Sequence, residues 1–452
     1  PGSRPKIVVA TNVAETSLTI EGVTTVIDSG LARMADFDTR RGINTLTIQK
    51  ISQASADQRA GRAGRTAPGT CIRLWSEVDH AARPAQTPPE IHRMDLAEVV
   101  LTLLVSGIED LESFQWFEKP DDEALTRAQA LLEDLDALKD GKLTSLGRKL
   151  ARFPVTPRYA RILVEGTVTG NFEELTQIIA LTQGRPIFLR RDAKSREEFT
   201  QPNDVSDFQP LLRALATARD FGFDPNRCQQ IGVHAHAARE VDRLAKQLRR
   251  TKLQLHSSTG QSLFSCLLTG FPDQIAKRLN RSNKACAVAG NRRGKLGDES
   301  CVTDSDLLIA AEITEIEGKD VNVLLNLNTA VTREQLMSEF PGSFRAGESA
   351  EWNPRERRVE ALEVLKYRDL ILESKPAKDP PEALAAEILA REVLAGNLVL
   401  KKWDGKVESW IARLNTLATA LPEYELPTFG EDEKQAVIEQ ICLGALSYKQ
   451  IK

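Results

Sequence analysis

The feature that most constrains this chain is an eight-residue run, Gln58 to Arg65, that reads Gln-Arg-Ala-Gly-Arg-Ala-Gly-Arg. Its arginines recur at every third position, so a helical turn would bring them towards one face, and the glycines between them allow close approach of a ligand. Guanidinium groups bind phosphate through paired, planar hydrogen bonds, and fixed arginines stabilise the charge on a phosphate in transfer. The run therefore favours a phosphate-handling site over a solvated arginine cluster.

Length and composition are those of a globular protein with several domains. The 452 residues suffice for about three domains, and 41% hydrophobic and 27% charged residues are ordinary values. The net charge of -4 means that any nucleic-acid surface must be local. The six cysteines lack CxxC spacing, which argues against a zinc site or a disulfide framework. We therefore expect no metal site. No signal sequence or membrane-spanning run is visible, so we also expect no membrane association and a cytoplasmic location.

The first part of the chain has the pattern of an α/β sheet. Short β-branched runs at 6–11 and 23–28 predict buried parallel strands, and 70–75 predicts a closing strand. Residues 37–50 alternate around Arg41-Gly42 and predict a hairpin. In such sheets, ligands bind at the carboxyl ends of the strands.

Three stretches resemble the DEAH/RHA helicase family. Residues 10–20, Ala-Thr-Asn-Val-Ala-Glu-Thr-Ser-Leu-Thr-Ile, resemble motif V, residues 58–65 resemble motif VI, and residues 37–50 resemble the hairpin that the family inserts between them. Their order and spacing are those of the family. The resemblance implies that residues 1–78 are the later part of the second RecA-like domain.

Downstream, the resemblance implies a multidomain fold that combines α/β, α and β parts. The partial RecA-like parallel sheet would be followed by a winged helix at 79–156, a helical ratchet bundle at 157–272 and an OB-like barrel at 273–375. A helical C-terminal extension at 382–452, similar to that of HrpB-type helicases, would follow and be truncated.

Periodicity supports the helical part of this assignment. Apolar residues recur at helical spacing in four segments, which predicts helices at 157–166, 171–183, 207–220 and 229–250. Residues 375–381 are rich in proline and predict a linker. Acids and bases alternate over 239–252, which predicts a salt-bridged helix surface, and His234 and His236 are expected to have surface or packing roles.

The resemblance assigns the nucleotide contacts. Gln58 would contact the γ-phosphate, and Arg62 and Arg65 would be arginine fingers, whereas Arg59 is expected to form a structural ion pair. Ser17 and Glu21 would also face the nucleotide, although relatives often carry Asp in place of Glu21.

Candidate nucleic-acid contacts lie in three places. Thr11, Asn12 and Thr16 follow the predicted strand end and could hold a phosphate, although Asn12 or Thr16 could instead cap a helix.

Arg40 and Arg41 at the hairpin tip could form a wedge against the strand path, or simply keep an edge hairpin soluble. The run 277–295, which includes Arg292 and Arg293, contains seven basic residues and no acid, and could follow a phosphate backbone or be a solvated basic face.

The sequence contains only part of the chemistry that ATP hydrolysis needs. Neither Gly-x-x-x-x-Gly-Lys-Ser/Thr nor Asp-Glu-x-His occurs. By the resemblance, both belong to the first RecA-like domain, so ATP and Mg²⁺ would require that missing domain. We therefore expect an ATP-dependent helicase that acts on single-stranded nucleic acid, with RNA as the expected substrate, and no hydrolysis by this chain alone. The alternatives are a non-enzymatic nucleic-acid-binding or regulatory module and a protein scaffold built on the helical bundle.

Overall fold

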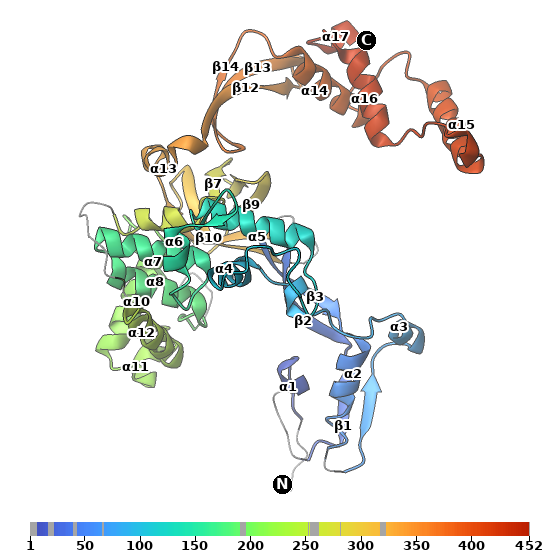
Figure 1. Ribbon diagram of the computed structural model, residues 1–452. Helices are drawn as coiled ribbons and strands as arrows, with labels where there is room; N and C mark the ends of the chain where they lie inside the picture. The colour runs from blue at the N-terminus through green and yellow to red at the C-terminus, as the bar shows by residue number, and fades with distance from the viewer. Residues whose placement is uncertain are drawn as a thin grey trace. The chain divides into compact units, whose positions relative to one another are not determined.

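The computed structural model describes residues 7–16, 22–38, 43–65, 67–189, 196–251, 253, 262–280, 282–316 and 322–451. The chain divides into two compact units, residues 1–339 and 340–452 (Figure 1). Among the helices described, none is long and apolar enough to cross a membrane.

The first unit begins with a two-stranded parallel sheet. β1 (Thr25–Asp28) pairs with β4 (Thr70–Arg73), and Ile27 lies opposite Ile72. These strands confirm the strands predicted at 23–28 and 70–75 and the parallel direction expected for 23–28. The burial predicted for 23–28 is wrong, since Ile27 is 67% exposed.

The prediction of a strand at 6–11 is wrong over its described residues. Residues 7–11 form no strand, and Ile7 and Val9 are 92% and 94% exposed. A β-branched run becomes a strand only where a neighbour completes its hydrogen bonds, and neither β1 nor β4 pairs with this run.

The predicted hairpin is confirmed and is longer than expected. β2 (Leu31–Asp38) pairs antiparallel with β3 (Ile43–Lys50) along its whole length, whereas the pattern indicated a start at residue 37. Its turn, with Arg40 and Arg41, lies outside the described residues. α2 (Gln53–Ala60) follows β3 directly and lies beside β1.

A helical segment with a short hairpin follows. The elements after β4 are α3 (Glu77–Ala81), the 3-10 turn Glu90–His92, α4 (Ala97–Val105), α5 (Asp122–Asp134), β5 (Leu138–Lys139), β6 (Lys142–Leu143) and α6 (Ser145–Leu150). α4 and α5 bury apolar faces that include Leu101, Leu104 and Leu132.

The next elements form a helical bundle. They are α7 (Pro157–Thr169), α8 (Phe172–Gln183), α10 (Phe208–Asp220), α11 (Pro225–Gln230) and α12 (Ala235–Arg249). The predictions for 157–166, 171–183 and 207–220 are confirmed. The single helix predicted at 229–250 is wrong at its start, because residues 231–234 separate α11 from α12 and Gly232 adopts a φ of 69°.

Five strands close into a small barrel. They are β7 (Ile275–Arg278), β8 (Ala285–Val288), β9 (Arg292–Leu296), β10 (Leu307–Ile316) and β11 (Asn322–Ala330). The pairing order is β11-β9-β8-β7-β10, and β10 also pairs with β11, which closes the sheet. Its core contains Cys286, Val288, Leu308 and Leu325.

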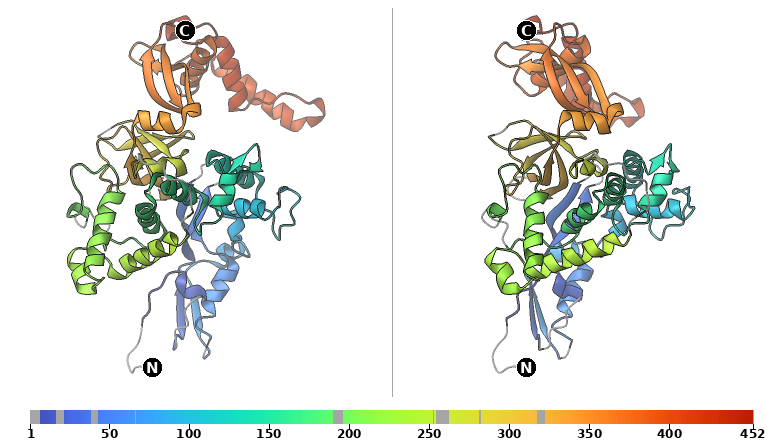
Figure 2. Two further views of the ribbon diagram at one scale, coloured as in Figure 1. Left: turned by 60° about the vertical axis from the view of Figure 1, so that its left-hand side comes forward. Right: turned by 90° about the vertical axis from the view of Figure 1, so that its left-hand side faces the viewer.

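The hairpin extends the barrel sheet. β3 pairs in parallel with the end of β10, with Asn44 opposite Thr314 and Leu46 opposite Ile316. Figure 2 shows the blue hairpin strands reaching the barrel. Backbone hydrogen bonds therefore join the N-terminal segment to a sheet more than 250 residues away in the sequence.

Buried polar contacts join the helical bundle to the barrel. Asp207, at the start of α10, accepts hydrogen bonds from the amides of Cys301 and Asn328 at 2.8 and 2.7 Å. The Arg158 guanidinium on α7 forms two hydrogen bonds with the Asp273 carboxylate just before β7. The bundle and the barrel are thus held by specific contacts as well as by chain connection.

The second unit packs helices on an antiparallel sheet. It contains β12 (Phe344–Asn353), β13 (Arg358–Tyr367), β14 (Leu370–Pro376), α14 (Glu382–Leu394), α15 (Gly405–Ala420), α16 (Glu431–Cys442) and α17 (Tyr448–Ile451). Val359 on the sheet shares a core with Leu389 and Ile438 on the helices. α15 buries only Ile411 and projects from the other helices of this unit (Figure 1).

This division corrects two expectations from the sequence. The range 273–375 does not form one body, because the first unit ends at residue 339 and β12–β14 pack with the C-terminal helices. The predicted linker at 375–381 is a short connection within the second unit, since it joins β14 to α14.

Candidate phosphate and nucleic-acid site

The helix that carries the start of the arginine run is held firmly at its N-terminus. The Ser52 hydroxyl accepts a hydrogen bond from the Ser55 amide at 3.2 Å, and the amides of Gln53 and Ala54 donate to the carbonyls of Pro84 and Ala85. These contacts satisfy N–H groups that a helix start leaves without an intrahelical partner. α2 ends at Ala60, so Arg59 lies in its last turn, and Arg62 and Arg65 follow it.

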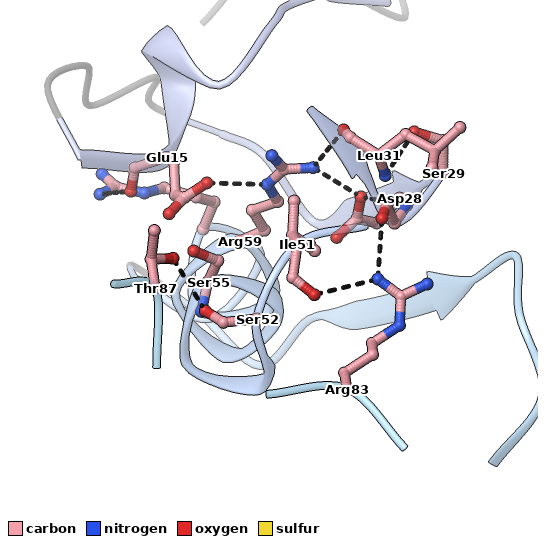
Figure 3. A network of polar contacts seen from close by, with 12 residues as sticks. Glu15, Asp28, Ser29, Leu31, Ile51, Ser52, Ser55, Arg59, Arg83 and Thr87 are labelled. Atoms are coloured by element: carbon pink, nitrogen blue, oxygen red, sulfur yellow. Dashed lines mark hydrogen bonds and ion pairs between the residues drawn. The ribbon is translucent and has the colours of Figure 1, made fainter. Parts of the chain in front are cut away.

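Arg59 is the structural arginine of the run, as predicted. Its Nε donates to Glu15 Oε2 at 2.9 Å, and its Nη1 donates to Asp28 Oδ1 at 3.0 Å and to the Leu31 carbonyl at 3.2 Å (Figure 3). The Arg59 side chain is 14% exposed and that of Asp28 only 3%. Arg59 therefore fastens α2 to α1 (Val13–Thr16) and to the carboxyl end of β1.

The other candidates in the run differ in exposure. Arg62 is half-buried and donates from Nη2 to the Glu15 backbone carbonyl. Gln58 and Arg65 are exposed. The run thus combines one arginine anchored within its own fold with a half-buried and an exposed arginine beyond the helix end, where a bound anion could reach them.

A buried arginine that the sequence pattern did not reveal braces the base of the hairpin. Arg83 donates to the carbonyls of Gly30 and Ile51 at 2.7 and 3.1 Å (Figure 3). Its guanidinium also lies 4.3 Å from the centre of the Trp75 ring. Hydrogen bonds from Lys50 and from Arg83 lower the pKa of Asp79. A single Arg after a short helix carries no motif, so only the tertiary contacts identify this role.

The segment before α1 presents polar groups at its surface. Thr11 and Asn12 are exposed, and their carbonyls accept the amides of Ala14 and Glu15 at 3.1 and 2.9 Å. Thr16 ends α1, and its side chain is outside the described residues, as are Ser17 and Glu21.

A groove of about 890 Å³ opens beside this segment. Asn12 and Glu15 line it, together with residues of β2, the start of α2, the approach to α4 and the start of α7. Its wall carries two arginines, Arg33 and Arg93, and four carboxylates, Glu15, Glu90, Asp95 and Glu98. Neither arginine stood out in the sequence, because each is isolated there and only the fold brings it next to Asn12.

The basic run at 277–295 is not one uniform surface. Arg278 is buried and donates to the Thr303 carbonyl, and half-buried Arg292 donates to the carbonyls of Ala289 and Asp273. Arg293 on β9 is exposed. The strand alternation explains the difference, since neighbouring residues of a strand point to opposite faces.

Two further expectations agree with the contacts. On α12, Asp242 binds Lys246 at 2.8 Å and Arg219 at 2.8 Å, as expected for a salt-bridged helix surface. His234 caps α12, since its Nδ1 accepts the Ala237 amide at 3.2 Å, and His236 lies 3.5 Å from a Glu240 oxygen. Over the part of the chain that the structure describes, no group of three or more His, Cys, Asp or Glu residues could hold a metal ion.

Comparisons with known proteins agree with this architecture. The family description "Helicase conserved C-terminal domain" matches residues 1–67, and "Helicase associated domain (HA2), winged-helix" matches residues 128–155.

Two curated relatives cover different parts of the chain. It is 28% identical to the ATP-dependent RNA helicase HrpB of Escherichia coli over 441 residues, which is 97% of this chain and 50% of that protein. It is 37% identical to a pre-mRNA-splicing factor ATP-dependent RNA helicase of Schizosaccharomyces pombe over 290 residues, which is 62% of this chain and 25% of that protein.

Solved structures extend the similarity to the whole fold. The crystal structure of the E. coli DExH-box NTPase HrpB is 26% identical, with a TM-score of 0.63 over 100% of this chain and 52% of that one. The chain thus spans about half the length of HrpB, and a second structure, described as the Escherichia coli DEAH/RHA helicase HrpB, matches with a TM-score of 0.64. Motifs, fold and relatives therefore agree in supporting a chain similar to the C-terminal part of a DEAH/RHA helicase of the HrpB type.

Proposed function

We propose that this chain is the arginine-bearing half of an ATP-dependent RNA helicase, in which ATP hydrolysis drives movement along single-stranded RNA. Arg62 and Arg65 act as fingers on a triphosphate, and Gln58 contacts its γ-phosphate. ATP and Mg²⁺ are held by a phosphate-loop domain that these 452 residues do not contain, so the chain alone does not hydrolyse ATP. Ser17 and Glu21 also face the nucleotide, by family position.

The observation that carries this proposal is that the arginines of the run differ in their contacts and exposure. Arg59 is held by Glu15 and Asp28, whereas Arg65 is exposed and Arg62 is half-buried beyond the helix end. A rigid helix with guanidinium groups past its end suits an arrangement in which a phosphate arrives from a second domain. Domain closure would then be required for each hydrolysis event.

RNA binding is the second part of the proposal. Asn12 and Arg33, which line the groove, contact the sugar-phosphate backbone, and Thr11 and Thr16 do so by family position. Arg293 on the barrel and Arg40 and Arg41 of the hairpin add further contacts, whereas Arg292 supports the barrel through its bonds to backbone carbonyls. Relatives described as RNA helicases support RNA as the substrate class.

The test compares the complete protein with an Arg62→Ala variant. Because an arginine finger contributes roughly 10³–10⁵ in turnover, we expect RNA-stimulated ATP hydrolysis to fall by at least about 10³-fold while RNA binding is retained. Arg391→Ala, which removes an exposed arginine of the second unit, is the matched control and should leave turnover unchanged. Near-normal turnover in Arg62→Ala, or steady RNA-stimulated hydrolysis by the 452-residue chain alone, would refute the proposal.

A further inference from the structure

The solvent-facing side of α12 carries a row of basic side chains. These exposed residues recur at intervals of four, three and four positions, and are Arg239, Arg243, Lys246 and Arg250. The last of them is the C-cap residue, and it keeps helical backbone angles. At about 3.6 residues per turn and about 1.5 Å rise per residue, this spacing places all four in one stripe about 16 Å long. We call these four residues the α12 stripe.

The acidic residues of α12 do not lie on the stripe. Helical geometry places Glu240 and Asp242 on either side of it. A Glu240 oxygen lies 3.5 Å from His236, and buried Asp242 is bound by Arg219 and Lys246, each at 2.8 Å. Because both acids have basic partners of their own, they leave the charge of the three arginines in the stripe uncompensated from within the helix.

Two arginines of the stripe are available to a ligand. Within the part of the chain that the structure describes, neither Arg243 nor Arg250 forms an ion pair or a side-chain hydrogen bond. Arg239 donates to the Phe223 carbonyl at 3.3 Å and lies 5.7 Å from the centre of the Phe223 ring. The chain has a net charge of -4, so an acid-free basic stripe is a local exception that favours a polyanionic partner.

The side chains of the stripe indicate which polyanion fits. Guanidinium groups bind phosphate oxygens through paired hydrogen bonds. Proteins that bind single strands also use aromatic side chains, on which the bases stack, and no residue of the stripe is aromatic. In an RNA duplex the bases are paired inside, and proteins contact mainly the phosphates and 2′-hydroxyls. A row of cations without stacking groups therefore suits a duplex better than a single strand.

We propose that the α12 stripe binds the phosphate backbone of a double-stranded RNA segment. This surface is separate from the groove beside α1, because no residue of the stripe lines that groove. It gives the chain a second RNA contact, for the paired part of a substrate whose single-stranded part occupies the groove. The choice of RNA as the polyanion rests on the proposed function, but the stripe takes no part in ATP hydrolysis.

The experiment measures the binding of two fluorescein-labelled RNAs to the 452-residue chain by anisotropy over a series of salt concentrations. One RNA has a duplex stem and a single-stranded 3′ tail, and the other is the tail alone. Each lost phosphate contact should lower the slope of log affinity against log salt by about one. We therefore expect Arg243→Gln/Arg250→Gln to lower this slope by about two for the stem-bearing RNA and to leave the slope for the tail unchanged.

Two controls separate the stripe from a general effect of charge. Arg391→Gln/Arg413→Gln removes two exposed arginines from α14 and α15 and should change neither slope. Arg243→Lys/Arg250→Lys keeps both charges and should keep most of the slope for the stem-bearing RNA. Exposed substitutions seldom unfold a protein, and circular dichroism checks that each variant is folded.

Three results would overturn the proposal. They are an unchanged slope for the stem-bearing RNA in Arg243→Gln/Arg250→Gln, an equal loss of slope for both RNAs, and a wild-type chain that binds the stem-bearing RNA no more tightly than the tail. The first would leave an acidic protein as the partner of the stripe, and the second would assign the stripe to single strands. None of them bears on the proposed function, which fails instead if Arg62→Ala retains turnover.

Discussion

The ion pair between Arg158 and Asp273 allows a quantitative test of how the bundle is joined to the barrel. Arg158 Nη1 and Nη2 donate to the two Asp273 oxygens at 2.6 and 2.8 Å, and Nη1 also donates to the Gly270 carbonyl at 3.1 Å. The side chains are only 14% and 18% exposed. Burial by itself would raise the pKa of Asp273, but the charge and hydrogen bonds of Arg158 outweigh it and hold the pKa well below its ordinary value of 3.8.

The perturbation is Asp273→Asn, which keeps the shape and removes the charge. Arg158 stays protonated at all accessible pH values, so the variant leaves a guanidinium at low exposure with only neutral acceptors. Breaking a buried pair by removing one partner costs roughly 3–5 kcal/mol. Because some solvent reaches both side chains, we expect a loss of about 2–4 kcal/mol in the free energy of unfolding.

The pH dependence has a definite sign. The pKa of Asp273 is lowered in the folded state, so its contribution is fully present above the unfolded value, near 3.8, and is lost as pH falls through the folded value. The stability difference between the wild type and Asp273→Asn should therefore be constant near neutral pH and shrink below about pH 4.

The assay is urea unfolding of the 452-residue chain, followed by tryptophan fluorescence and by circular dichroism. Asp298→Asn is the matched control, because its pair with Lys284 spans 3.0 Å in the same barrel while the Asp298 side chain is 99% exposed. We expect no measurable change in that variant. The reasoning is refuted if Asp273→Asn is no more destabilising than Asp298→Asn, or if the difference grows in acid.

Two smaller predictions test other parts of the first unit. Gly30 has a φ of +72°, and a Cβ there would lie 2.6 Å from Arg83 Nη2, whereas Gly107 has a φ of +91° with open space around it. Both alanine variants should be destabilised, because alanine is strained in a left-handed backbone conformation. The free energy of unfolding in urea should fall by about 1–3 kcal/mol more for Gly30→Ala, because its Cβ overpacks the site. Equal losses in the two variants would contradict this. Burial and the Asp207 carboxylate raise the pKa of Cys301 to about 12, so at pH 8 its labelling, read by peptide mass spectrometry, should be about a thousandfold slower than in urea. Labelling at the unfolded rate would contradict the burial of this thiol.

The hairpin shows why sequence distance is a poor guide to which parts of this chain belong together. Its residues were expected to act as a separate wedge or a solvated edge, and its tip lies outside the described residues. Instead, residues Asn44 to Leu46 of β3 pair in parallel with the C-terminal end of β10. Edge strands carry unpaired backbone groups, and pairing β3 with β10 satisfies one such edge.

Local sequence patterns were enough to predict the arginine run, the hairpin and several helices of this protein. The order Gln58 to Arg65, the alternation that makes β2 and β3, and the apolar stripes of α7, α8 and α10 all depend on neighbours within a few residues, so each could be recognised without a fold. The family resemblance follows from the same local patterns. The structural ion pair of Arg59 was also expected.

Tertiary structure decided which of these groups meet. Residues 7–11 have the composition of a strand but no partner in the described sheet. Arg83 carries no motif yet braces Gly30 and Ile51, and Arg292 turns inward to backbone carbonyls while Arg293 does not. The link from Glu15 to Arg62 likewise joins residues 47 positions apart. Hydrogen bonds and burial depend on which segments the fold brings together. A local sequence pattern does not specify these long-range contacts.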